Sequence, residues 1–136
     1  MIVRSKANAI LSGLFPNGSS GGTYIGLSTT TPNENGGNFT EPTVGSTTGY
    51  KRAKVEVMGT PSDGQIQNTD IIFFPESLGD GWGTITHFGL FSAQTGGTPY
   101  FWGELTGSSV QIPAGYIPIF RAGALIVGLD KDPLDV

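Results

Sequence analysis

The sequence predicts an all-β fold: an antiparallel β-sandwich of the jelly-roll type, with about seven or eight strands and one short N-terminal α-helix. Short runs of β-branched and aromatic residues recur along the chain between turn residues, as in sandwiches and barrels. Glycine is abundant, with 22 of 136 residues, whereas only 13% of the residues are charged. An aromatic content of 10% argues against disorder, so we interpret the glycines as turns. We expect a single domain over residues 1–136, because a chain of this length can bury one core.

Residues 3–14 are the best helix candidate. One helical face there collects apolar side chains at Val3, Ala7, Ile10, Leu11 and Leu14. Phe15-Pro16 ends the helix, because proline cannot continue it. Such a helix either docks on a neighbouring subunit or covers one end of its own domain, and the sequence leaves both interpretations open.

The first predicted strands surround a long polar loop. Residues 23–29 are β-prone, and residues 30–49 are rich in Asn, Gly and Thr. A loop of this length is uncommon in a compact domain, so we expect it either to form an interface or to be mobile. Residues 50–58 then alternate, which predicts a half-buried strand with Arg52 and Lys54 on a charged outer face.

The second half of the chain contains the clearest hairpin signal. Two aromatic runs at 84–91 and 100–105 flank the turn residues Thr-Gly-Gly at 95–97. Further strands are expected at 66–74 and 110–112, and a closing segment at 116–129 divides near 121–123. Residues 130–136 form an acidic tail.

Charge and composition exclude several classes of partner. The formal net charge is −4, and the basic cluster at Lys51, Arg52 and Lys54 is too small for a nucleic-acid interface. The chain has no cysteine, which excludes disulfides and thiolate metal sites. No apolar stretch approaches the roughly 20 residues that cross a membrane. The apolar stretch after Arg4 and Lys6 is interrupted by polar residues, so we expect no export signal.

Catalytic and metal-binding residues are not predicted. His87 is the only histidine and lies in the middle of a predicted strand, so we expect a partly buried side chain that holds a hydrogen bond. No nucleophile elbow and no His-Glu-x-x-His motif accompanies it. Glu76, Asp80 and Glu104 are carboxylates without a motif, and the acidic tail lacks the ligands of a calcium loop. We therefore expect no enzyme, no cofactor and no bound metal.

Tyr100, Phe101 and Trp102 form an aromatic run that fits two roles. Alternation along a strand places Tyr100 and Trp102 on one face and Phe101 on the other. Such rings either fill the core or a subunit contact, or they stack on sugar rings at the surface. Tyr100 and Trp102 are therefore the candidate residues for binding a carbohydrate.

The N-terminal helix and the loop at 30–49 are the parts that a minimal sandwich needs least. Low charge and abundant Gly, Thr and Ser suit surfaces that lie against another protein with little desolvation cost. We therefore predict an assembly interface in these parts. Its apolar anchors are Ile10, Leu14 and Phe39, and its charged rim is Lys51, Arg52 and Lys54.

An ordered set of short segments carries a resemblance to a known family. These segments are YIGLSTTTP at 24–32, NFTEP at 38–42, GYKR at 49–52, IIFFPE at 71–76, WGTITHFGLFSAQTGG at 82–97, YFWGELT at 100–106, AG at 114–115 and FRAGALIVGLD at 120–130. In this order, the chain resembles the short proteins of tailed bacteriophages known as tail-fibre or minor structural proteins. The resemblance covers most of residues 2–130. It implies a β-sandwich-like component of the virion that is present in many copies, and it carries over no catalytic residue.

With this resemblance, the sequence predicts a non-enzymatic structural component of a tailed-phage virion that acts through protein–protein contacts. A tail-fibre, baseplate or collar part and a capsid-decoration protein all fit the sequence. We expect the partners to be other copies of the chain, in a trimer or a ring, and other virion proteins, with no nucleic acid and no membrane. The protein would be made in the bacterial cytoplasm before assembly. The alternative function is a carbohydrate-binding module that recognises the host cell surface.

Overall fold

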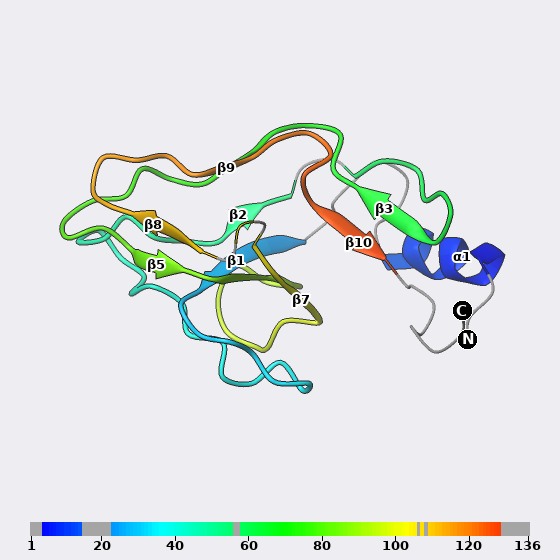
Figure 1. Ribbon diagram of the computed structural model, residues 1–136, viewed down its shortest axis with the longest axis horizontal. Coiled ribbons are helices and arrows are strands. Elements are labelled where there is room, and N and C mark those ends of the chain that lie inside the picture. Colours follow the sequence, from blue (N-terminus) through cyan, green and yellow to red (C-terminus); the bar gives the residue numbers. More distant parts are fainter. Residues whose placement is uncertain (1–3, 15–22, 56–57, 106, 108, 129–136) are drawn as a thin grey trace. The chain divides into compact units, whose positions relative to one another are not determined.

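The computed structural model describes residues 4–14, 23–55, 58–105, 107 and 109–128, and all structural statements concern these residues (Figure 1). They contain the helix α1 (Arg4–Leu14) and ten short strands. The strands are β1 (Tyr24–Ser28), β2 (Ala53–Lys54), β3 (Gln65–Gln67), β4 (Ile72–Phe73), β5 (Gly83–Ile85), β6 (His87–Phe91), β7 (Phe101–Glu104), β8 (Val110–Ile112), β9 (Ile119–Phe120) and β10 (Ile126–Gly128). The prediction of an antiparallel all-β fold with one short N-terminal helix is confirmed. The sandwich arrangement stays a prediction.

The chain divides into two compact units. The first comprises 1–21, 55–72 and 120–136, and the second comprises 22–54 and 73–119. Each unit has its own buried apolar residues. The expected single domain stays a prediction, and the expected acidic tail at 130–136 lies outside the described residues.

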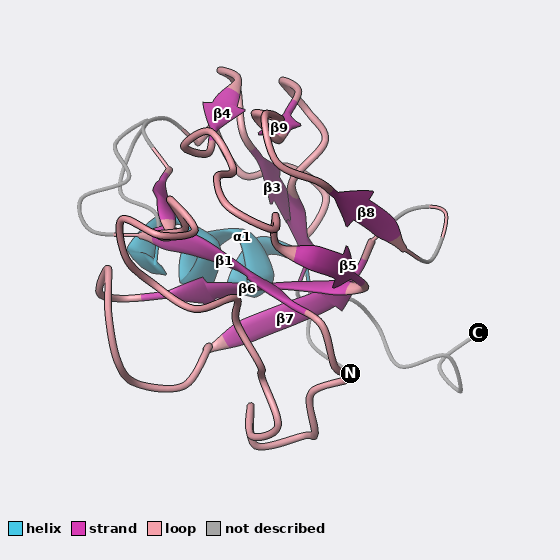
Figure 2. Ribbon diagram, turned by 90° about the vertical axis from the view of Figure 1, so that its left-hand side faces the viewer, coloured by secondary structure: helices cyan, strands magenta, loops and turns pink. Residues whose placement is uncertain are grey.

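The second unit is built on a four-stranded antiparallel sheet in the order β2-β1-β6-β7. Figure 2 shows β1, β6 and β7 side by side. The predicted hairpin is confirmed, because β6 pairs with β7 and places Gly89 opposite Trp102. On the other side of β6, the register places Gly26 of β1 opposite Gly89. Ile25, Leu27 and Leu90 are buried, and these side chains give the sheet its apolar core face.

An aromatic cluster forms another part of the core of the second unit. The rings of Tyr50 and Phe74 both meet Trp82 edge to face, with centroids 5.1 and 6.2 Å away. The Trp82 indole Nε1 donates a hydrogen bond of 2.7 Å to the carbonyl oxygen of Thr48. This buried donor is therefore satisfied, and it holds the end of the 30–49 loop in place.

The first unit contains α1 and the β3–β10 ribbon. The helix contacts β3, and Leu11 is fully buried, as are Ile66 and Leu125. The side-chain oxygen of Asn8 accepts a hydrogen bond of 2.8 Å from the backbone nitrogen of Gly64. Of the two interpretations of the helix, the structure thus supports a cover for its own unit at Leu11. A further role in docking stays a prediction.

The buried side-chain amide of Asn68 connects separate segments of the first unit. Asn68 donates from Nδ2 to the carbonyl oxygens of Asp70 (2.8 Å) and Arg121 (2.9 Å), and its Oδ1 accepts from the backbone nitrogen of Leu125 (2.9 Å). These bonds connect the segment after β3 to the turn before β10. They explain why the closing segment 116–129 divides near 121–123 into β9 and β10, as predicted.

Two predicted strands are each broken into two. The segment 84–91 splits at Thr86, because β5 pairs with β8 whereas β6 pairs with β1 and β7. The segment 66–74 splits into β3 and β4, which belong to different ribbons. These breaks raise the number of strands in the described residues from the expected seven or eight to ten. In the described residues of the segment 50–58, which leave out 56 and 57, the β structure is the two-residue strand β2 and isolated bridges at Tyr50 and Met58.

Candidate functional site

Two glycines on neighbouring strands of the second unit's sheet lie against the long loop. Gly26 of β1 lies opposite Gly89 of β6, and Gly89 in turn lies opposite Trp102 of β7. A Cβ atom on Gly89 would lie 2.7 Å from the Phe39 ring, and one on Gly26 would lie 2.8 Å from Glu41 Oε2. The absence of side chains at both glycines therefore lets the loop lie directly on the sheet.

Side-chain hydrogen bonds fasten this part of the loop. Ser28 Oγ accepts from the backbone nitrogens of Thr30 and Thr40, at 3.1 and 3.0 Å. Asn33 Oδ1 accepts from the backbone nitrogens of Asn35 and Gly37, at 3.0 and 2.9 Å, which is an Asx turn. The loop from 28 to 41 is thus tied to β1 and folded on its own sheet, which does not fit a freely mobile segment.

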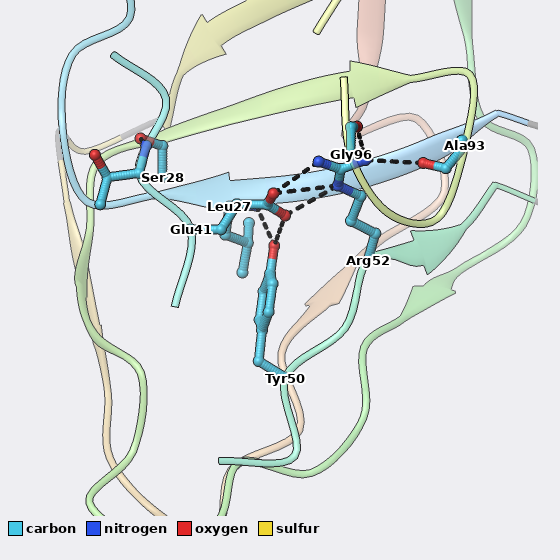
Figure 3. Close-up of polar contacts among 8 residues, drawn as sticks. Leu27, Ser28, Glu41, Tyr50, Arg52, Ala93 and Gly96 are labelled. Atoms are coloured by element: carbon cyan, nitrogen blue, oxygen red, sulfur yellow. Dashed lines mark hydrogen bonds and ion pairs between the residues drawn. The ribbon is translucent and has the colours of Figure 1, made fainter. Parts of the chain in front are cut away.

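Arg52 and Glu41 form a buried ion pair under this loop (Figure 3). Arg52 Nη2 donates to Glu41 Oε1 at 2.8 Å, and Arg52 Nε donates to Glu41 Oε2 at 3.0 Å. Arg52 Nη1 donates to the carbonyl oxygens of Ala93 and Gly96, both at 2.9 Å. A single guanidinium therefore joins the 30–49 loop to the β6–β7 loop.

The predicted position of Arg52 on a charged outer face is wrong. Arg52 is only 4% exposed, and its Cζ lies 3.4 Å from the centroid of the Phe91 ring. The physical reason is the loop, which brings the Glu41 carboxylate over this face of the sheet and buries the guanidinium in a cation–π contact. Lys51 and Lys54 are exposed, as a charged rim requires.

Tyr50 completes the buried network. Its hydroxyl donates to Glu41 Oε2 at 2.5 Å and accepts from the backbone nitrogen of Leu27 at 3.0 Å. Burial, and then the neighbouring Glu41 carboxylate, raise the pKa of Tyr50 well above its usual value. Tyr50 therefore keeps its proton, and the network is a structural clamp between two loops and β1.

The other predicted interface residues differ in their surroundings. Ile10 on α1 is exposed. Phe39 is half-buried, because its ring meets Phe91 edge to face with centroids 5.2 Å apart. Leu14 ends α1, but its side chain lies outside the described residues. A role of these residues in assembly stays a prediction, although Phe39 already contacts its own sheet.

Tyr100 and Trp102 are exposed at the β7 edge of the sheet, whereas Phe101 is half-buried. The Trp102 indole Nε1 donates to the carbonyl oxygen of Asn33 at 3.0 Å. The hydroxyls of Tyr100 and Thr23 lie 3.3 Å apart. Both rings are thus held in place and still present surface to solvent.

His87 has the environment that the sequence predicts. It is buried in β6, and its Nδ1 lies 2.8 Å from the Thr86 hydroxyl oxygen. The carboxylates of Glu76, Asp80 and Glu104 are exposed. Among the described residues, no group of three or more side chains could hold a metal ion. No helix in the part of the chain that the structure describes is long and apolar enough to cross a membrane.

A second exposed feature of this unit was not predicted from the sequence. The segments 73–78 and 115–119 lie antiparallel, with backbone hydrogen bonds from Phe74 to Pro118 (3.0 Å) and from Ser77 to Tyr116 (2.8 Å). On the outside of this pair, Phe73, Ile117 and Ile119 are 63%, 55% and 40% exposed, and we call these three side chains the ribbon face. The only signal in the sequence is that IIFF at 71–74 has no polar residue on either face.

Comparison with known proteins is consistent with the resemblance found in the sequence. The family described as "Podophage GP4 fiber I protein gp80" matches residues 5–128, which include nearly all of the described residues. No curated protein matches the chain. The match supports a phage fibre protein, and thus a virion component. The chain therefore belongs to the gp80 family of podophage fibre proteins and is a structural fibre component of a phage.

Proposed function

We propose that this fibre component is a non-enzymatic protein that is present in many copies and acts through protein–protein contacts. The observation that carries the proposal is its exposed apolar surface. Twelve large apolar or aromatic side chains are exposed among the described residues, in a chain of which only 13% of residues are charged. Three of them, Phe73, Ile117 and Ile119, lie together in the ribbon face, and clusters of exposed apolar residues on a folded protein commonly mark interaction sites.

The polar groups of the site support a structural role. Arg52, Glu41 and Tyr50 hold one another and backbone atoms, so none of them is left to act on a substrate. Nucleophilic or acid–base catalysis needs a reactive group that a second group activates within reach of a substrate. The buried network instead satisfies its own donors and acceptors, as a stabilising clamp does.

The family name favours a tail-fibre part over a baseplate, collar or capsid-decoration protein. Quantitative mass spectrometry of purified particles tests the proposal through copy number. A count of about six to a few dozen copies is expected for a symmetric tail or fibre part. Hundreds of copies would instead indicate the capsid shell. Absence of the protein from the particle would refute the proposal.

A second candidate function is binding of a host-surface carbohydrate at Tyr100 and Trp102. The observation in its favour is that both rings are exposed and fixed by uncharged groups, Trp102 by the Asn33 carbonyl and Tyr100 by the Thr23 hydroxyl. Glycan-array binding that is lost in Trp102→Ala would support it. The matched control is Tyr116→Ala, which removes an exposed aromatic ring from another segment of the same unit.

A further inference from the structure

The ribbon face has a buried counterpart on the inner side of the same segments. Phe74 is buried against Trp82, at a centroid distance of 6.2 Å, and Pro118 is half-buried. Phe73, Ile117 and Ile119 precede or flank these inward residues and are exposed, as alternation along a strand requires. All of these residues belong to the second unit. The segment pair is therefore apolar on both sides, although only one side is packed.

The charge pattern of these segments limits what can cover the ribbon face. Residues 71–75 read IIFFP and residues 113–120 read PAGYIPIF, so neither stretch contains a charged residue, and the exposed Glu76 follows the first. The three side chains of the ribbon face themselves offer no group for an ion pair. The chain as a whole carries a net charge of −4, so two copies repel one another least at an uncharged face.

The strand geometry favours a partner that is itself a strand. In the part of the chain that the structure describes, β4 and β9 form a sheet of only two strands, so no further described strand runs along the outer edge of either one. Two-stranded sheets are marginal alone and gain stability when further strands are added. An antiparallel partner strand can supply backbone hydrogen bonds along such an edge and apolar side chains beside it.

From these observations we propose that the ribbon face binds the ribbon face of a second copy of this chain about a two-fold axis. A two-fold contact brings the same surface patch together from both copies, so an uncharged apolar patch is complementary to itself. The proposal rests on the multi-copy function proposed above and names the surface through which copies meet. The N-terminal helix and the 30–49 loop stay predicted contacts to other proteins.

The area of the face predicts a weak contact. A buried aromatic side chain covers about 150–250 Å², so the exposed parts of the three side chains amount to roughly 300 Å². A pair of copies would bury roughly 600 Å² through these side chains, against the about 1,200 Å² of the smallest stable interfaces. Backbone edges and the neighbouring Tyr116 add to this area. The isolated pair should therefore dissociate in the micromolar range and gain strength when many copies are held together.

Cysteine cross-linking tests the geometry directly, because the natural chain has no cysteine. Ile117→Cys places one thiol in the ribbon face, and oxidation should then yield disulfide-linked dimers of the full chain. The matched control is Val44→Cys, since Val44 is as exposed as Ile117 but lies in the 30–49 loop. Dimers from Ile117→Cys alone support the proposal. Equal cross-linking of both variants, or none from Ile117→Cys, overturns it.

Sedimentation equilibrium tests the energetics. The pair Phe73→Ser and Ile119→Ser should raise the dissociation constant at least about ten-fold, whereas Val110→Ser should leave it unchanged. Tryptophan fluorescence checks that the double variant is folded. If it is not, the cross-linking of Ile117→Cys tests the proposal instead. A natural chain that stays monomeric at about 100 µM overturns the proposal. If particles contain many copies while the double variant associates normally, only this inference fails; if particles lack the protein, the proposed function fails.

Discussion

Removing the Glu41 carboxylate should destabilise the second unit more than any exposed charge in the same loop. In Glu41→Ala the Arg52 guanidinium keeps its two carbonyl partners but loses its counter-charge. The Tyr50 hydroxyl loses its acceptor at the same time. Both groups are almost fully buried, so water cannot replace the missing carboxylate.

The magnitude follows from this burial. Removing one partner of a buried ion pair costs about 3–5 kcal/mol, whereas an exposed pair contributes about 0–1 kcal/mol. Arg52 is 4% and Glu41 18% exposed, so the buried case applies. We expect Glu41→Ala to lower the free energy of unfolding by about 3–4 kcal/mol, a large part of the about 5–15 kcal/mol of a typical domain. Glu34→Ala removes an exposed carboxylate of the same loop and should cost less than about 0.5 kcal/mol.

Urea unfolding followed by tryptophan fluorescence measures this loss in the right part of the molecule. Trp82 and Trp102 are the only two tryptophans, and both belong to the second unit, which carries the network. Adding Arg52→Met to Glu41→Ala removes the orphaned charge, so the double variant should be less destabilised than the sum of the single variants. A loss below about 1 kcal/mol for Glu41→Ala would refute a buried and uncompensated Arg52.

Three further predictions follow from the packing. Because the pKa of Tyr50 is raised in the folded state, its stabilising effect is complete below about pH 10 and is lost as the pH rises further; the free energy of unfolding, measured with urea, should fall there by up to about 1.4 kcal/mol per pH unit, and less steeply in Tyr50→Phe. Gly89→Ala places a methyl group against the Phe39 ring and should cost about 1–3 kcal/mol in the same assay; a neutral result would mean that the loop does not lie on the sheet. Leu11→Ala should cost about 2–5 kcal/mol and speed hydrogen exchange in α1 and β3, whereas exposed Ile10→Ala should do neither; equal effects would contradict the packing of the helix on its own unit.

Local signals in the sequence predict much of the fold. Apolar periodicity and Phe15-Pro16 predict α1, and the aromatic runs around Thr-Gly-Gly predict the β6–β7 hairpin. The break at Thr86 could not be predicted, because residues 83–91 are continuously β-prone. Only the partners differ: β8 pairs with the first part, and β1 and β7 pair with the second.

Alternation predicts which residues share a face, but not what covers that face. It groups Arg52 with Lys54 on one face, but Arg52 is buried whereas Lys54, in β2, is exposed. Burial of Arg52 depends on Glu41, which belongs to a loop with no periodicity of its own. The sequence therefore identifies the charge but not its partner, and it assigns the arginine to the surface. For the opposite reason, the ribbon face was missed: the IIFF segment looks like a buried strand on both sides.

The burial of Arg52 and the exposure of the ribbon face together indicate where the protein can contact other proteins. Phe39 and Arg52, both predicted as interface residues, are already used to fasten the 30–49 loop to its own sheet. That face is consequently less available for assembly than the sequence suggests. The second unit keeps exposed apolar side chains at the β7 edge with Trp102, at the ribbon face beside Tyr116, and also at Val44, Leu78 and Val110. The 30–49 loop, which the sequence predicts as an interface, thus stabilises its own unit. The antiparallel segments that carry the ribbon face are the part of this unit that we expect to contact another protein.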